Sequence, residues 1–126
     1  MGKVQYLRVP DHIEVNRGQL DTLCGQIGPQ ATEEVVCRAM EELAVRLGSI
    51  STHLCDGEAE PVAKLARSMV GIADQVGLVT LATAARNLSD AAASGDHHAM
   101  TATGVRLARV GDSSLLEVFC IQGLSI

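Results

Sequence analysis

Apolar residues recur at alternating intervals of three and four over three long stretches of this chain. The first stretch, from Thr32 to Leu54, carries Val36, Met40, Leu43, Leu47, Ile50 and Leu54. The second carries Val62, Leu65, Met69, Ile72 and Val76, and the third carries Leu78, Leu81, Ala85, Leu88 and Ala92. This spacing is the period of an amphipathic α-helix, so the pattern predicts three helices that each turn one stripe toward a core.

Helix-breaking residues divide these stretches. Asn16 can cap a short helix that ends at Ile27, and Pro61 suits the first turn of the helix that carries the second stripe. The expected breaks are Gly28-Pro29, Asp56-Gly57, Gly77 and Ser94-Gly95-Asp96. Because the connections are short, consecutive helices are expected to be antiparallel neighbours.

The last segment, from His97 to about Gly123, is less regular. Gly104, Gly111 and the polar cluster at 112–114 interrupt its pattern, which predicts either one kinked helix or two shorter ones. Residues 1–15 predict an irregular arm, and residues 16–126 a single domain. The predicted fold is all-α, an antiparallel up-and-down four-helix bundle with a short extra helix at its N-terminal side.

Composition agrees with helix-on-helix packing. Of the 126 residues, 47% are apolar but only 2% are aromatic. The net charge of −5 argues against nucleic acid as a partner, because phosphate backbones need a basic surface. No apolar run is long enough for a membrane span, and no apolar signal segment follows the first residues. We therefore expect a cytoplasmic protein that does not bind membranes.

Little in the sequence points to catalysis. Cys24, Cys37, Cys55 and Cys120 are dispersed, with no histidine at zinc-ligand spacing, and are expected to be reduced thiols. Nucleophile triads, phosphate-binding glycine loops and metal motifs are absent at usable spacing. The sequence thus predicts no enzyme activity, no metal and no cofactor.

One face of the second-stripe helix is chemically distinctive. Arg67 lies two residues from both Leu65 and Met69, so it is predicted to point away from the core. The residues that share its face by helical spacing are Ala63, Lys64, Val70, Gly71 and Asp74. An exposed cation beside a glycine leaves room for another surface to approach, although an ordinary solvated helix face is the alternative interpretation.

The ordered set of motifs around this face resembles the histidine phosphotransfer (HPt) domain family. The relevant pieces are the stretch 65–71, reading Leu-Ala-Arg-Ser-Met-Val-Gly, then Val76-Gly77-Leu78, and then Ala93-Ser94-Gly95-Asp96. The family typically reads Ala-His-x-Leu-Lys-Gly, then a Leu-Gly turn, then a helix that ends near Gly-Asp. The resemblance covers roughly residues 16–120, and it implies the HPt helical bundle and a place in two-component signalling.

The chain departs from the family pattern at the reactive position. The resemblance places Arg67 where the family has its phosphoryl-carrying histidine and Val70 where it has lysine, and only Gly71 is kept. A guanidinium stays protonated at cellular pH and is a poor nucleophile. The four histidines lie elsewhere, and none sits in the family's context. They are His12, His53, His97 and His98.

The resemblance and this departure together predict a pseudo-phosphotransfer module. It would dock a response-regulator receiver domain or a sensor kinase without carrying phosphate, through the face of Ala63, Lys64, Arg67, Val70, Gly71 and Asp74. Two alternatives stay open. One is an active phosphotransfer protein that uses another histidine, and the other is a self-associating structural bundle with no signalling role. A monomer or a weak homodimer is expected.

Overall fold

Five helices contain most of the residues that the structure describes. The computed structural model describes the backbone of residues 13–122 and the side chains of residues 13–115. The helices are α2 (Arg17–Ile27), α3 (Pro29–Cys55), α4 (Ala59–Gln75), α5 (Val79–Ser94) and α6 (His97–Gln122). Within the described range the only extended pairing is one isolated antiparallel bridge between Val15 and Leu78. The all-α prediction is confirmed.

Helix ends follow the local sequence closely. The Asn16 side chain accepts the backbone N–H of Gln19 at 3.0 Å, as an N-cap does, and Asp96 accepts that of Ala99 at 3.1 Å. Gly28, with φ of 90°, ends α2 and also precedes α3. Pro29 is the first residue of α3, because its missing N–H is harmless there, so this helix begins three residues before the predicted Thr32.

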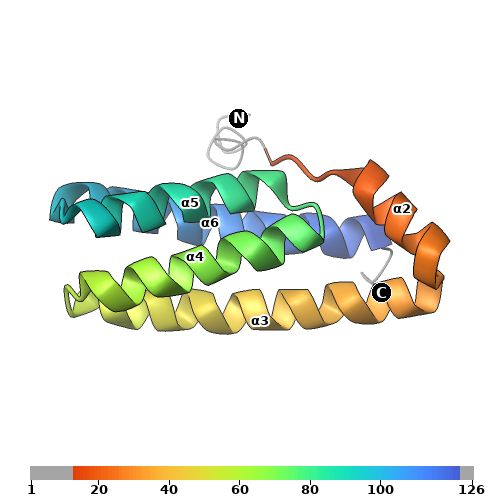
Figure 1. Ribbon diagram of the computed structural model, residues 1–126, viewed down its shortest axis with the longest axis horizontal. Coiled ribbons are helices and arrows are strands. Elements are labelled where there is room, and N and C mark those ends of the chain that lie inside the picture. Colours follow the sequence, from red (N-terminus) through yellow and green to blue (C-terminus); the bar gives the residue numbers. More distant parts are fainter. Residues whose placement is uncertain (1–12, 123–126) are drawn as a thin grey trace, which may run out of the picture.

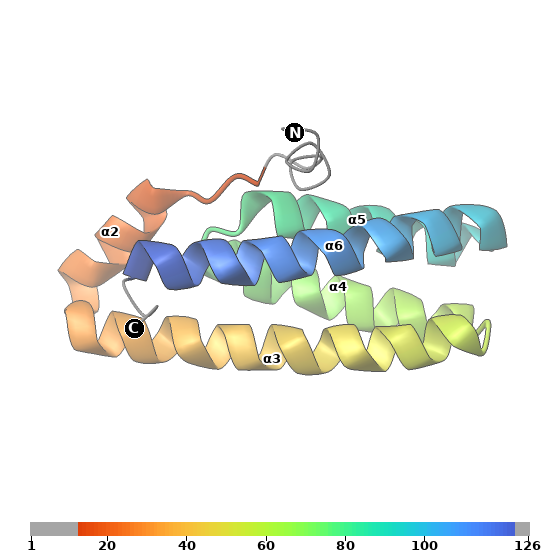
Figure 2. The ribbon, with the colours of Figure 1, turned by 180° about the vertical axis from the view of Figure 1, so that it is seen from behind.

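Helices α3 to α6 form an antiparallel up-and-down bundle (Figure 1). Helix α4 packs on α3 and α5, and α6 packs on the same two helices, so α4 and α6 stand diagonally opposite each other. Figure 2, seen from behind, has α6 in front of α4. The short helix α2 crosses one end of the bundle, beside the turn between α4 and α5. The outward face of α4 is therefore available on the side away from α6.

The core combines long aliphatic side chains with alanines. Leu43, Met69, Leu81, Leu88 and Leu107 are among its fully buried members. On α4 the buried stripe is rotated from the predicted one. Its members are Val62, Ala63, Ala66, Met69 and Ala73, followed by Val76 just beyond the helix, whereas Leu65 and Ile72 are only partly buried. The α4 backbone thereby approaches the alanine-rich helix α5 closely.

Helix α6 is continuous, so its two glycines do not interrupt it. A Cβ atom at Gly104 would lie 2.5 Å from Cδ1 of Leu54, and one at Gly111 would lie 2.6 Å from Cδ1 of Leu47. Seven residues separate the glycines, and seven separate the leucines of the antiparallel helix α3. Each glycine thus opens a hole that receives one leucine, in the manner of knobs-into-holes packing.

The segment before α2 lies against the turn between α4 and α5. The backbone N–H of Asn16 donates to the carbonyl of Gly77 at 2.7 Å, and that of Val79 donates to Glu14 at 3.1 Å. Gly77 has φ of 76°, and a Cβ there would lie 2.9 Å from the carbonyl oxygen of Asn16. This close approach requires glycine. Of the predicted N-terminal arm, residues 1–12, including His12, lie outside the described residues.

Candidate functional site

The exposed face of α4 carries most of the residues predicted for docking. Lys64, Arg67, Gly71 and Asp74 are exposed, and Val70 is half-buried. Because they follow one another at intervals of three and four, they form a continuous strip along the helix. We call these five residues the α4 strip.

Ala63, the sixth residue predicted for this face, is buried, with 8% of its surface exposed. The buried hydroxyl of Ser89 on α5 donates to the Ala63 carbonyl at 3.4 Å. Close packing of α5 against this side of α4 is therefore the reason that Ala63 belongs to the core. It does, however, line a groove at the edge of the strip.

Two cations of the α4 strip are free. Arg46 pairs with Glu42 and donates to the Ser68 hydroxyl, and Arg86 pairs with Asp74. Neither Lys64 nor Arg67, by contrast, forms a hydrogen bond or ion pair with any described residue. Their full hydrogen-bonding capacity faces solvent and is available to a partner.

Gly71 leaves the centre of the strip open. An added Cβ there would meet no atom of the described residues within 4 Å, and the residue has an ordinary helical conformation. Packing inside this chain therefore does not require glycine at this position. Its effect is to lower the surface one turn after Arg67, where another backbone or side chain can approach.

A groove lies on the α5 side of the strip. It has a volume of about 370 Å³, and its lining is formed by Ala59, Glu60, Ala63, Lys64, Arg67, Ala92 and Ala93. Alanines make up most of this lining, so the side chains of Lys64, Arg67 and Glu60 are its only polar side chains. We call it the α4–α5 groove.

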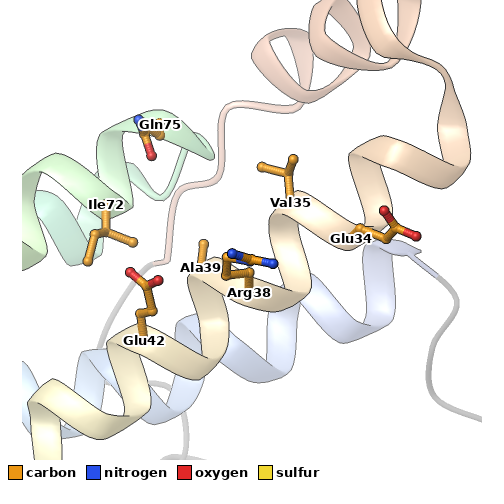
Figure 3. A pocket seen from close by; sticks show the side chains of 7 residues that line it. All are labelled: Glu34, Val35, Arg38, Ala39, Glu42, Ile72 and Gln75. Carbon is orange, nitrogen blue, oxygen red and sulfur yellow. The ribbon is translucent and has the colours of Figure 1, made fainter.

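A second groove lies on the α3 side (Figure 3). Its volume is about 360 Å³, and its lining is formed by Glu34, Val35, Arg38, Ala39, Glu42, Ile72 and Gln75. Val35 is 41% exposed although it is a large apolar residue. This α3–α4 groove does not follow from the helical periodicity of the sequence. Its one signal is Val35, which stands beside the core residue Val36 and extends the apolar surface of α3 beyond the core stripe.

The end of the strip is held by α2. The Gln19 amide donates to the carbonyls of Asp74 and Gln75, at 2.6 and 3.0 Å. These carbonyls belong to the last turn of α4, where no further turn of the helix supplies N–H donors. Helix α2 thus fixes the last turn of α4, next to the side chain of Asp74.

The three histidines among the described residues lie on helices other than α4. His53, near the end of α3, is half-buried, and its Nδ1 lies 2.5 Å from a carboxylate oxygen of Glu58. His97 and His98 are exposed at the start of α6. Helix α4 itself contains no histidine. At the middle of its exposed face lies Arg67.

Other chemistry is sparse in the described range. No three or more His, Cys, Asp or Glu side chains between residues 13 and 115 are grouped as metal ligands. Cys24, Cys37 and Cys55 are free thiols, and the side chain of Cys120 lies outside the described residues. No described helix combines the length and apolar character of a membrane span.

The helical bundle matches the fold of a histidine-containing phosphotransfer protein of known structure. The chain is similar to the crystal structure of histidine-containing phosphotransfer protein B (HptB) from Pseudomonas aeruginosa PAO1, with a TM-score of 0.80. The similarity covers 89% of this chain and 96% of that chain, at 18% sequence identity. No protein-family model and no curated protein matches the sequence. The HPt-like fold is thus confirmed by structure, although the two sequences are only 18% identical.

Proposed function

We propose that this chain is an HPt-like signalling module that docks a receiver domain of a response regulator, or a sensor kinase, without carrying phosphate. The observation that supports it best is the exposure of unpaired Arg67 at the centre of the α4 strip, in an HPt-like bundle. The resemblance in sequence assigns the phosphoryl-carrying histidine to this same position.

The chemistry of Arg67 argues against relay. A phosphoryl carrier must attack with a neutral nitrogen and later release the group, as imidazole does. Guanidinium keeps its proton at cellular pH. Val70 adds no cation where the family pattern has lysine, so one source of transition-state charge stabilisation is also missing.

The same residues suit binding. A guanidinium forms charge-assisted, often bidentate hydrogen bonds with carboxylates, and the phosphorylation pocket of a receiver is acidic. Glycine at position 71 lets a partner approach the helix backbone, and the α3–α4 groove offers Val35 and Ile72 as apolar contacts beside it. The module would then sequester its partner or hold it in one state.

Binding and phosphoryl transfer, measured on the same samples, test this proposal. Receiver domains from the source genome, phosphorylated and unphosphorylated, are mixed with the full chain. We expect at least one receiver to bind while no label moves to this chain. Arg67→Ala should weaken the binding, whereas Arg109→Ala on the opposite helix α6 should not.

Label on the chain would overturn the proposal. Mapping it to His12, His53, His97 or His98 would then establish the alternative, an active phosphotransfer protein that uses another histidine. Absence of binding to every receiver and kinase tested, combined with a stable oligomer by light scattering, would instead favour the structural bundle.

A further inference from the structure

The two grooves beside the α4 strip differ in charge. The α4–α5 groove has two cations, Lys64 and Arg67, and one carboxylate, Glu60. The α3–α4 groove has the reverse balance, with the carboxylates Glu34 and Glu42 and the single cation Arg38. On a protein with a net charge of −5, the α4–α5 groove is therefore a local site for an anion.

The cations of this groove are placed for a group with more than one negative charge. Lys64 and Arg67 stand one helical turn apart on the same side of α4, and neither forms an ion pair with a described residue. Glu60 lines the same groove one turn before Lys64, so the groove keeps an excess of one positive charge. The alanine floor contributes no competing donor or acceptor side chain. Guanidinium can bind two oxygens of one phosphoryl group, and the ammonium adds a mobile point charge.

Phosphorylation of an aspartate replaces a carboxylate of one negative charge by a phosphoryl group of about two, with three acceptor oxygens. At that aspartate the unmodified receiver offers one negative charge to the two cations, whereas the phosphoryl group offers about two charges and three oxygens, and so can engage both Arg67 and Lys64. Because of the second cation, Lys64, the groove should bind the phosphorylated receiver more tightly than the unphosphorylated one.

From this arrangement we infer that the α4–α5 groove reads the phosphorylation state of the docked receiver. The module binds the receiver whose aspartate carries a phosphoryl group more tightly than the unmodified one. No covalent bond forms or breaks in this step, because Arg67 and Lys64 only donate hydrogen bonds. The inference rests on the proposed function, since it specifies which form of the receiver the same site prefers.

Calorimetric titration of the full chain with a receiver tests it, in magnesium buffer with and without beryllofluoride, which occupies the phosphoryl position. We expect about tenfold tighter binding of the beryllofluoride form. Lys64→Ala and Arg67→Ala should each reduce this ratio, and the double variant should bring it to about one. Arg67→Lys should keep part of the ratio, because it retains charge but loses the bidentate geometry.

Arg109→Ala is the charge-matched control, and it should leave the ratio unchanged. Equal affinity for the two forms, or a preference that survives in the double variant, would overturn the inference while the docking module stands. Failure of every receiver to bind in either form would overturn the proposed function, and this inference with it.

Discussion

Gly71 offers a test that separates the needs of the fold from those of docking. Glycine in a helix interior costs about 1 kcal/mol relative to alanine. Because a Cβ at position 71 would meet no atom of the described residues within 4 Å, we expect no steric clash to offset this gain in stability. Gly71→Ala should therefore stabilise the protein by about 0.5–1 kcal/mol, which corresponds to a rise in Tm of about 2–5 °C for a domain of this size.

Gly48 provides a matched control. It lies inside α3, is exposed, and would also bring a Cβ into open space, so Gly48→Ala should give a similar gain. Urea unfolding followed by far-UV circular dichroism measures the free energy of unfolding of both variants. An unchanged m-value shows that the same amount of surface is exposed on unfolding.

Binding should separate the two variants. If the partner docks on the α4 strip as proposed, the added methyl at position 71 would lie in the interface. Overpacking there costs about 1–3 kcal/mol, so receiver affinity should fall about tenfold. Gly48→Ala should leave the affinity unchanged. Loss of stability in Gly71→Ala would refute the structural reasoning. If Gly71→Ala is more stable but binds the receiver with unaltered affinity, Gly71 does not belong to the docking surface.

Three further predictions concern packing, capping and the reactive position. Gly104→Val should destabilise the protein by about 1–3 kcal/mol, since its Cβ would overlap Leu54, and a double-mutant cycle with Leu54→Ala should recover part of that loss. Asn16→Ala removes the N-cap of α2 and should cost about 1 kcal/mol in chemical unfolding, whereas Asn16→Asp should cost little. Arg67→His combined with Val70→Lys should make the chain accept label from a phosphorylated receiver, and failure to do so would count against an HPt-type alignment of α4.

The helices could be predicted from the sequence because leucine, valine and methionine mark the core stripes at helical spacing. Alanine was the weak point. It is compatible with either environment, so the fully buried Ala66 and Ala73 gave no signal, and Ala63 was placed on the wrong side. Whether these alanines are buried depends on how closely α4 packs against α5. That distance is set by both helices together, so the sequence of one helix alone does not predict it.

The glycines of α6 illustrate the same difficulty. As single residues, Gly104 and Gly111 are poor helix formers, which is why the sequence predicts either one kinked helix or two shorter ones for this segment. Their spacing of seven positions matches that of Leu47 and Leu54 on α3. This match between two distant segments is the feature of the sequence that indicates a continuous helix packed against α3. At the site, helical periodicity was enough to predict that Arg67 is exposed. The two grooves could not be predicted in this way, because each is formed between α4 and a neighbouring helix.

The contacts of the segment before α2 bear on the order of folding. The backbone N–H of Glu14 donates to the Thr80 hydroxyl at 2.6 Å across 66 residues, whereas α4 and α5 are adjacent in the chain. Closing so long a loop costs more entropy than forming a helical hairpin, so we expect the α4–α5 pair to assemble early and α2 to dock late. The last turn of α4, whose carbonyls accept the amide of Gln19, would then complete its hydrogen bonds only at the end of folding.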